Sequence, residues 1–257
     1  FLLAAKVGGI NANDKYRGQF IYENLMIQNN VIHSAHKSGV KKLIFIGSAC
    51  IYPKFSKQPI SENELLNGYL EKTNEPYAVA KIAGIKLCQS YFEQYKNNFI
   101  SLMPNNLYGP NDNFDLETSH VIPALIRKFH QAKLSSKDQV TVWGTGNPQR
   151  EFVHVDDLVS AMIFTMKNID AKQIYTRGIS HINVSSGEEV SIRDLAFMVK
   201  KITGFQGEIN FDNSMPDGTP RKVLDGTFLY QLNWYSKIRL ENGLKLLYSW
   251  YIENQSK

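Results

Sequence analysis

The sequence predicts an α/β fold in which helices cover both faces of a doubly wound parallel sheet. Two short runs, residues 43–46 and 99–103, are continuously apolar and do not alternate with polar residues. Strands that are buried on both faces show this pattern. Each run follows a segment with the apolar spacing of a helix, at about residues 19–38 and 75–95. The order helix, strand, helix, strand is typical of parallel sheets with crossover helices.

The start of the chain predicts three elements. Residues 1–5 are apolar and resemble the end of a buried strand, and because the chain does not begin with Met we expect it to be a fragment. Gly8 and Gly9 predict a loop after this strand. The helix over residues 19–38 should stop at Gly39, since glycine suits the position after a helix end.

A second long helix should begin at Glu75 and Pro76, because proline suits the first helical positions, and should run to about Tyr95. The strand at residues 99–103 comes next. Residues 105–110 follow this strand directly, so we expect them to face the space above the sheet.

Beyond Pro110 the predicted elements are short and mixed, which indicates a smaller lobe packed on the carboxyl end of the sheet. Ser191, with Asp194 three residues later, predicts the start of a helix that ends at Gly204. The other predicted elements are a helix at 122–130, strands at 140–143 and 150–154, a helix capped by Asp156 and Asp157 that ends near Met166, strands at 182–184 and 208–211, a turn at 216–218 and a helix at 240–253.

The composition is that of a soluble globular protein. Of the 257 residues 43% are apolar and 21% are charged, and no apolar run approaches the roughly 20 residues of a membrane crossing. The net charge of +5 is spread along the chain, so we expect an anionic small molecule as ligand, with no nucleic acid and no membrane as partner. Cys50 and Cys88 lack paired spacing, which indicates a reducing compartment, and we expect the cytoplasm. His33 and His36 have no third ligand nearby, so no metal site is predicted.

Tyr77 and Lys81 supply the Tyr-x-x-x-Lys pattern of this chain. Their spacing places both side chains on one face of the helix that begins at Pro76, where they can meet the end of the 43–46 strand. A neighbouring ammonium group favours the phenolate, so we expect Lys81 to lower the pKa of Tyr77 toward neutrality. Ser48, just past the strand end, can donate a hydrogen bond to the same substrate oxygen. A surface Tyr-Lys pair and a turn serine remain the alternative.

Four further residues could carry chemistry. Cys50 lies at a strand terminus, where catalytic groups gather in open α/β sheets, although a small buried apolar residue is the simpler interpretation and the one adopted for Cys88. His120, taken alone, is an ordinary residue of a loop or helix start. Arg150 and Lys222 suit a diphosphate, because cationic side chains bind its oxygens, yet each could equally be a surface cation.

The chain carries six motifs in order along its length. They are Gly-Ser-x-Cys-Ile-Tyr-Pro at 47–53, Asn-Glu-Pro-Tyr-Ala-x-Ala-Lys at 74–81, Met-Pro-x-Asn-Leu-Tyr-Gly-Pro at 103–110, Ser-His-Val-Ile-Pro-Ala at 119–124, Arg-Glu-Phe-x-His-Val-Asp-Asp at 150–157 and Pro-Asp-Gly-Thr-Pro-Arg-Lys at 216–222. Together they resemble the GDP-L-fucose synthase family, within the extended short-chain dehydrogenase/reductase superfamily. The resemblance spans essentially the whole chain and is far more specific than Tyr-x-x-x-Lys alone.

The resemblance implies an enzyme that converts GDP-4-keto-6-deoxy-D-mannose to GDP-L-fucose. The family epimerises C3 and C5 and then reduces the C4 ketone with NADPH. By this resemblance Tyr77 donates a proton to the C4 oxygen, Lys81 lowers its pKa and binds the nicotinamide ribose, and Ser48 holds the ketone. Cys50 and His120 are implied as the base and acid of the epimerisations, which need groups on opposite sides of a ring carbon and a stabilised enolate oxygen.

The same resemblance implies a Rossmann-like sheet, a homodimer and a set of ligand contacts. Residues 1–110 would be the remainder of the NADP-binding domain, with 150–170 and 180–186 contributing to it, and 111–257 mainly the substrate lobe. Subunits would pair through the helix that carries Tyr77 and the helix before it. The implied cofactor contacts are Ile46, Gly47, Ser48, Lys81, Asn105, Asn106, Leu107 and His120, and the implied substrate contacts are Lys128, Trp143, Arg150 and Lys222.

The chain departs from the family at its start. The family opens with a Gly-x-x-Gly-x-x-Gly turn and a helix whose N-terminus holds the pyrophosphate, and this sequence has no such turn. Two βα units of about 30 residues each would account for roughly 60 residues before Phe1. In the strand order 3-2-1-4-5-6, we expect the lost strands 1 and 2 to lie between the Phe1 strand and the 43–46 strand. We expect the chain by itself to bind NADPH weakly, which a fluorescence titration tests.

Two other functions remain open from the sequence. A nucleotide-sugar 4-epimerase or 4,6-dehydratase of the same superfamily also uses Tyr-x-x-x-Lys, but Cys50 together with His120 favours 3,5-epimerisation. A non-catalytic dinucleotide-binding scaffold commonly loses the Tyr/Lys pair, which this chain keeps at Tyr77 and Lys81.

Overall fold

The computed structural model describes residues 1–215 and 217–254, and a first group of elements surrounds a parallel three-stranded sheet. The strands are β1 (Lys42–Ile46), β2 (Asn98–Pro104) and β6 (Ile182–Val184), in the order β1-β2-β6. Both neighbouring pairs are parallel. The three strands predicted in these places are therefore confirmed.

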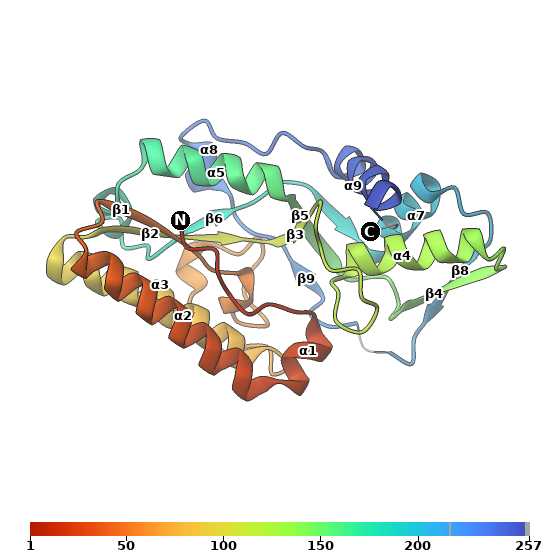
Figure 1. Ribbon diagram of the computed structural model, residues 1–257, viewed down its shortest axis with the longest axis horizontal. Helices are drawn as coiled ribbons and strands as arrows, with labels where there is room; N and C mark the ends of the chain where they lie inside the picture. The colour runs from red at the N-terminus through yellow and green to blue at the C-terminus, as the bar shows by residue number, and fades with distance from the viewer. Residues whose placement is uncertain (216, 255–257) are drawn as a thin grey trace.

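Helices cover both faces of this sheet (Figure 1). Leu43 and Phe45 enter one hydrophobic core, whereas Ile44 and Ile46 enter another on the opposite face. Because successive side chains of a strand point to opposite faces, a strand between two cores must be apolar throughout. The predicted doubly wound architecture is confirmed. The long helices are α2 (Arg17–Lys37) and α3 (Glu75–Tyr95) on one face and α5 (Val155–Asn168) on the other.

The predicted place of the first residues was wrong. We expected two absent strands between the Phe1 strand and β1, but Leu2 pairs directly with Phe45 in a parallel bridge. The Leu2 N–H donates to the Ile44 carbonyl at 2.8 Å, and the Ile46 N–H donates to the Leu2 carbonyl at 3.1 Å. These bonds use the polar groups on that edge of β1, so no other strand fits between the two segments.

A second group of elements forms smaller sheets at the other end of the molecule (Figure 1). These sheets pack around a separate hydrophobic core. One sheet joins β3 (Asn106–Tyr108), β5 (Gln149–His154), β7 (Glu189–Ser191) and β9 (Arg221–Lys222), and a second pairs β4 (Gln139–Trp143) with β8 (Glu208–Asp212). The helices packed here are α4 (Val121–Leu134), α7 (Ile192–Thr203) and α9 (Leu240–Asn254). The division into two domains stays a prediction.

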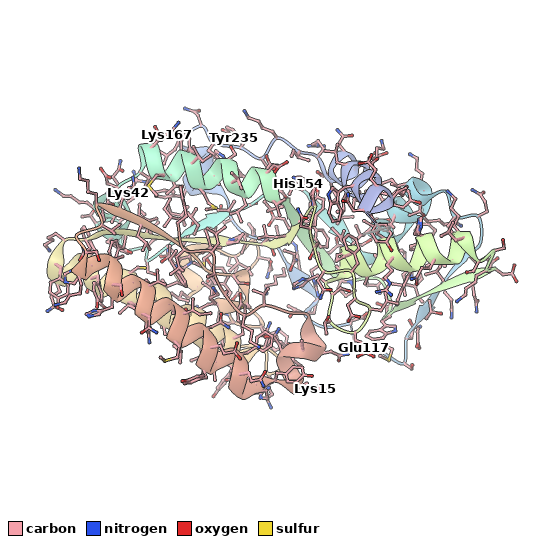
Figure 2. All side chains as sticks on the ribbon, in the orientation of Figure 1. Lys15, Lys42, Glu117, His154, Lys167 and Tyr235 are labelled. Carbon is pink, nitrogen blue, oxygen red and sulfur yellow. The ribbon has the colours of Figure 1, made fainter. Side chains whose placement is uncertain are left out.

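Helix ends test the sequence reasoning most sharply. Gly39 has the left-handed φ of 67° expected after a helix end, and the Ser191 hydroxyl accepts a hydrogen bond from the Asp194 N–H at 2.9 Å, as predicted. The predicted cap of α5 was wrong. Its N-cap is His154, whose ring nitrogen accepts from the Asp156 N–H at 3.2 Å, so the aspartates lie inside the first turn. Figure 2 shows His154 where β5 runs into α5.

Several short elements had no signal in the sequence, because a few residues are too short for periodicity to show. They are α1 (Ile10–Lys15), the 3₁₀ turns at Ala49–Ile51 and Glu62–Glu64, α6 (Ala171–Tyr175), α8 (Thr227–Tyr230), β3, β7 and β9. The predicted turn at 216–218 includes Pro216, which lies outside the described residues. Across residues 1–215 and 217–254, no helix combines the length and apolarity that a membrane crossing requires.

Candidate active site

The first part of the site is built where β1 ends. Gly47 leaves the strand so close to the Met103 side chain that any Cβ at this position would overlap it. Ser48 then caps the 3₁₀ turn that carries Cys50, and its hydroxyl accepts a hydrogen bond from the Cys50 N–H at 3.4 Å. Cys50 is buried, and Ser48 is half-buried. The two side chains are thus held at the carboxyl end of the sheet, where the sequence predicted them.

The second part comes from the first turns of α3. Lys81 is only 3% exposed, and its Nζ donates to the Ile46 carbonyl at 2.9 Å. The same Nζ lies 5.7 Å from the centre of the Tyr77 ring. The predicted pairing of Tyr77 and Lys81 on one helix face is therefore seen, and one buried hydrogen bond fixes that face to the end of β1.

The predicted effect of Lys81 on Tyr77 was wrong. Burial, together with the neighbouring Cys50 thiol, raises the pKa of Tyr77 well above its ordinary value, and a hydrogen bond with Ser48 only partly offsets this. Desolvation penalises a phenolate strongly, and the helical spacing of two residues does not reveal it. Burial also lowers the pKa of Lys81, to about 8. At neutral pH the site therefore holds a protonated phenol beside a weakly held ammonium proton.

The Cys50 thiol interacts electrostatically with lysines from two separate segments, Lys81 and Lys222. Burial raises the pKa of its thiol, and Lys222, Ser48 and Lys81 each act in the opposite direction. Burial in turn lowers the pKa of Lys222, which the Cys50 thiol partly offsets. Such coupling needs short distances in a poorly solvated space. Ser48, Cys50, Tyr77, Lys81 and Lys222 thus lie in one neighbourhood.

The four predicted substrate residues lie in two pairs, Arg150 with Lys222 and Trp143 with Lys128. Arg150 and Lys222 are register partners on the neighbouring strands β5 and β9. Burial lowers the pKa of Arg150, and Asp217 acts against this. On β4, Trp143 is 52% exposed, and the Lys128 Nζ lies 5.2 Å from the centre of its ring. Cations beside an exposed aromatic ring are suited to bind the phosphates and base of a nucleotide.

In the predicted cofactor segment, Asn105 joins β2 to β3, and Asn106 and Leu107 are the first residues of β3. The Asn105 side chain is 4% exposed, and its Nδ2 donates inward to Glu151 at 2.8 Å and to the Lys222 carbonyl at 3.2 Å. Its Oδ1 accepts from the Asn106 N–H at 3.0 Å. Asn105 therefore shapes this segment from inside, which leaves Asn106 and Leu107 as the half-exposed part.

His120 reaches the site less directly. It is the exposed N-cap of α4, and in the described part of the chain its ring has no hydrogen bond to Cys50 or Tyr77. The adjoining loop approaches α1, as Glu117 and Lys15 show in Figure 2, and the Gly9 N–H donates to the Thr118 carbonyl at 2.9 Å.

Gly8 and Gly9 lie closely packed between this loop and Phe20, which neighbours Tyr77. A Cβ at Gly9 would lie 2.8 Å from the Ser119 carbonyl oxygen, and one at Gly8 would lie 3.2 Å from the Phe20 ring. The Phe20 ring is 6.2 Å from that of Tyr77. The role of His120 stays a prediction.

The sequence reasoning missed a small pocket beside Cys50. Asn74 Oδ1 is buried without a hydrogen-bond partner there, and Lys54 forms an ion pair with Glu71 at 2.7 Å. The signal was available for Asn74, a polar residue directly before the helix that carries Tyr77. The lining residues are Cys50, Tyr52, Pro53, Lys54, Gln58, Ile60, Glu71, Asn74, Thr219, Arg221 and Lys222.

Comparison with known proteins shows to which family this chain belongs. The model of the NAD dependent epimerase/dehydratase family matches residues 1–184. The chain belongs to that family. Within it, the chain is 54% identical to GDP-L-fucose synthase of Escherichia coli K12, over all of this chain and 81% of the relative. It is 55% identical to GDP-L-fucose synthase 1 of Arabidopsis thaliana, over 98% of this chain and 76% of that protein.

Solved structures of the family share the fold. A GDP-6-OMe-4-keto-L-xylo-heptose reductase from C. jejuni matches with a TM-score of 0.95 and 42% identity, over 99% of this chain and 82% of that one. A GDP-L-fucose synthetase from Naegleria fowleri bound to NADP matches with a TM-score of 0.88 and 31% identity, over 99% and 76%. The chain thus shares its fold with proteins named as a GDP-sugar reductase and as an NADP-bound GDP-L-fucose synthetase.

The residues of this epimerase/dehydratase chain fit a nicotinamide cofactor at one point that the structure shows. An ammonium group has three N–H donors. Among the described residues, Lys81 Nζ has one hydrogen-bond acceptor, the Ile46 carbonyl. A buried ammonium with spare donors beside a phenol suits the hydroxyl groups of a ribose.

Proposed function

We propose that this chain carries the active site of a GDP-L-fucose synthase. The reaction is the NADPH-dependent conversion of GDP-4-keto-6-deoxy-D-mannose to GDP-L-fucose, by 3,5-epimerisation and 4-keto reduction. One observation carries the proposal: Cys50 is hydrogen-bonded to Ser48 just past the end of β1, and Lys81, which lies beside the Tyr77 ring, is hydrogen-bonded to Ile46 at the same strand end, so the predicted epimerising group and the predicted reductase residues meet at one place. The 54% identity to the E. coli enzyme over the whole chain supports the same reading.

Reduction needs an acid at the C4 oxygen, and NADPH would supply the hydride when bound. Tyr77 meets the first need, because its raised pKa keeps the phenol protonated at neutral pH until charge develops on the substrate oxygen. Ser48, which shares a hydrogen bond with Tyr77, holds the same oxygen. Lys81 binds ribose hydroxyls with its spare N–H groups and remains fixed to β1 through Ile46.

Epimerisation at C3 and C5 needs a base on one face of the ring and an acid on the other. We assign these roles to Cys50 and His120. The base removes the proton alpha to the C4 ketone, the electron pair moves onto the C4 oxygen, and the acid returns a proton from the opposite face. Burial raises the pKa of the Cys50 thiol, and Lys222 and Lys81 act against this by favouring the thiolate that the transfer needs.

The GDP part would bind the second half of the chain. Arg150 and Lys222, side by side on β5 and β9, neutralise the diphosphate. Trp143 and Lys128 offer a ring and a cation to the nucleoside.

Assembly and location form a further part of the proposal. Exposed apolar side chains on α2 and α3, among them Tyr22, Met26 and Val79, suit a homodimer built through these helices. Light scattering at micromolar concentration should then give twice the subunit mass, and a monomer mass would contradict it. Two buried free cysteines are compatible with the cytoplasm, where thiols stay reduced.

The experiment is product analysis with the complete gene product, including any residues encoded before Phe1. GDP-4-keto-6-deoxy-D-mannose and NADPH should yield GDP-L-fucose, with one NADPH consumed for each sugar. The second candidate is a 4-keto reductase without epimerisation, favoured by the reductase neighbour with a TM-score of 0.95. Such an enzyme would give an unepimerised GDP-6-deoxyhexose, and this product would overturn the proposal.

A further inference from the structure

A carboxylate buried between the two predicted binding regions has no role so far. Glu151 lies in β5 next to Arg150 and is 0% exposed. In the part of the chain that the structure describes, no lysine or arginine forms an ion pair with it. A buried carboxylate is costly unless it is paired or fully hydrogen-bonded. The compensation must therefore come from neutral donors.

These donors come from three segments far apart in the sequence. Oε2 accepts from Asn105 Nδ2 at 2.8 Å and from the Leu224 N–H at 3.0 Å. Oε1 accepts from the Ser185 hydroxyl, and from the N–H groups of Ser186 at 2.5 Å and Gly187 at 3.0 Å. One side chain thus fixes the link from β2 to β3, the link from β6 to β7 and the segment after β9.

Two of these segments carry predicted ligand contacts. On the substrate side, Asn105 Nδ2 also donates to the Lys222 carbonyl at 3.2 Å, and Leu224, which donates to Glu151, lies two residues farther along. Glu151 and Asn105 together therefore fix the backbone at Lys222 and just after it. On the cofactor side, Asn106 donates its N–H to Asn105 Oδ1 at 3.0 Å and its Nδ2 to the Glu151 carbonyl at 3.1 Å.

We propose that Glu151 is a positioning residue that sets the substrate cation Lys222 and the cofactor segment at Asn106 in fixed relative places. It touches neither ligand and acts through Asn105 and the backbone around Leu224. The inference rests on the proposed function, because it needs a site that takes a nucleotide sugar and a cofactor together.

The test separates this role from simple packing. Glu151→Gln keeps the size of the side chain but replaces one acceptor oxygen by an NH₂ donor. That donor would face N–H groups of the protein that are themselves donors, so at least one hydrogen bond is lost. If Glu151 positions both segments, the KM values for the GDP-sugar and for NADPH should each rise about tenfold or more, with loss of kcat. A packing role would leave both KM values unchanged, since it would alter only the amount of folded enzyme.

Glu189→Gln is the matched control, because Glu189 faces Glu151 across the β5–β7 pair but forms an exposed ion pair with Arg221 at 2.6 Å. The KM values of this control should stay within about twofold of wild type.

Should Glu151→Gln fail to fold, Ser185→Ala tests the same proposal, because it removes one donor to Glu151 and leaves the others. It should raise both KM values about threefold, and unchanged values in either Glu151→Gln or this variant would overturn the inference. An inactive wild type would instead contradict the proposed function.

Discussion

Two regions of the molecule hold the predicted functional residues in different ways. At the end of β1, the side chains of Cys50 and Lys81 are buried and that of Tyr77 is half-buried, and the three groups influence one another's pKa values. Along β4 and α4, Trp143 is half-exposed, and the Lys128 Nζ donates a hydrogen bond to the Thr141 carbonyl. The first region is preorganised by its own contacts, whereas the second remains open to a ligand.

The difference predicts how each region affects the reaction. Groups that are fixed and desolvated before substrate binds can stabilise the transition state without reorganisation. Groups that stay solvated contribute mainly when a ligand covers them. Substitutions near β1 should therefore lower kcat, and substitutions along β4 and α4 should raise KM. The following predictions test that division, from the largest effect to the smallest.

Tyr77→Phe should cause the largest loss of activity among substitutions in the first region. It removes the acid that donates to the C4 oxygen, and general acid catalysis contributes about 10²–10⁴-fold, so we expect kcat for reduction to fall by about 10³-fold. NADPH affinity should change by less than about threefold, because the ring remains beside Lys81. Steady-state kinetics with a fluorescence titration measure both. A kcat within tenfold of wild type would remove Tyr77 from the mechanism.

Lys81→Met should separate function from stability. The buried ammonium has a pKa lowered to about 8, so at pH 7 its charge opposes folding, and replacing it by an apolar chain should raise the free energy of unfolding by about 1–3 kcal/mol. We expect kcat to fall about 10²-fold, because the ribose contact and the hydrogen bond to Ile46 are lost. Urea unfolding tests the first effect. A less stable variant would contradict the assigned cost of this charge.

The pH dependence follows from the same group. Lys81 carries its ammonium form below a pKa of about 8, so kcat/KM for reduction should fall as the pH rises through 8. Burial raises the pKa values of Tyr77 and Cys50, which face Lys81, so we assign the fall near pH 8 to Lys81.

The stability contribution of Lys81 has the opposite sign. Between pH about 8 and 10.5 the folded state binds fewer protons at Lys81 than the unfolded state, so this residue makes stability rise with pH in that window. Lys81→Met is the control and should lose both trends. An unchanged pH profile in that variant would assign the titration to another group.

Arg150 lies on β5, and as a predicted substrate contact it should behave like the residues of β4 and α4 when alanine replaces it (Arg150→Ala). Loss of a half-buried guanidinium that faces the diphosphate should raise KM for the GDP-sugar by about tenfold, with kcat within about twofold. A fall in kcat with unchanged KM would erase the distinction between the regions.

Lys128→Met should have the smallest effect. Its Nζ lies over the Trp143 ring, and a partly exposed cation–π contact is worth about 0.5–1 kcal/mol, so KM should rise only about threefold. An effect larger than that of Arg150→Ala would place the diphosphate nearer α4 than we propose.

The same two regions explain what could be predicted from sequence. Tyr77 and Lys81 are four residues apart on a helix with clear start signals, so their shared face followed from periodicity alone. The direction of the pKa shift at Tyr77 did not, because burial depends on segments distant in the chain. Glu151 was missed for the same reason, although a carboxylate before Phe152 in a buried strand was a usable signal.

The errors in the fold have related causes. Of the buried strand end predicted over residues 1–5, only Leu2 forms a bridge to the sheet, and Phe1 and Leu3 are exposed. The neighbour in the sheet was wrong as well, since a short apolar run does not specify which strand it pairs with. The α5 cap was assigned to Asp156 by residue preference, whereas the end of β5 places His154 at that position. Elements of two or three residues, such as β3 and β9, carry no periodicity at all.

The most direct measurement follows hydrogen isotopes through the reaction. The complete gene product is given GDP-4-keto-6-deoxy-D-mannose and NADPH in D₂O, beside its Cys50→Ser variant, and the product is read by NMR. Wild type should place deuterium at C3 and C5 and the cofactor's hydrogen at C4, while the variant should slow exchange at both carbons and still reduce an epimerised ketone. Equal exchange in wild type and variant, or reduction without exchange in wild type, would contradict a single site in which the thiol and the phenol serve one sugar ring.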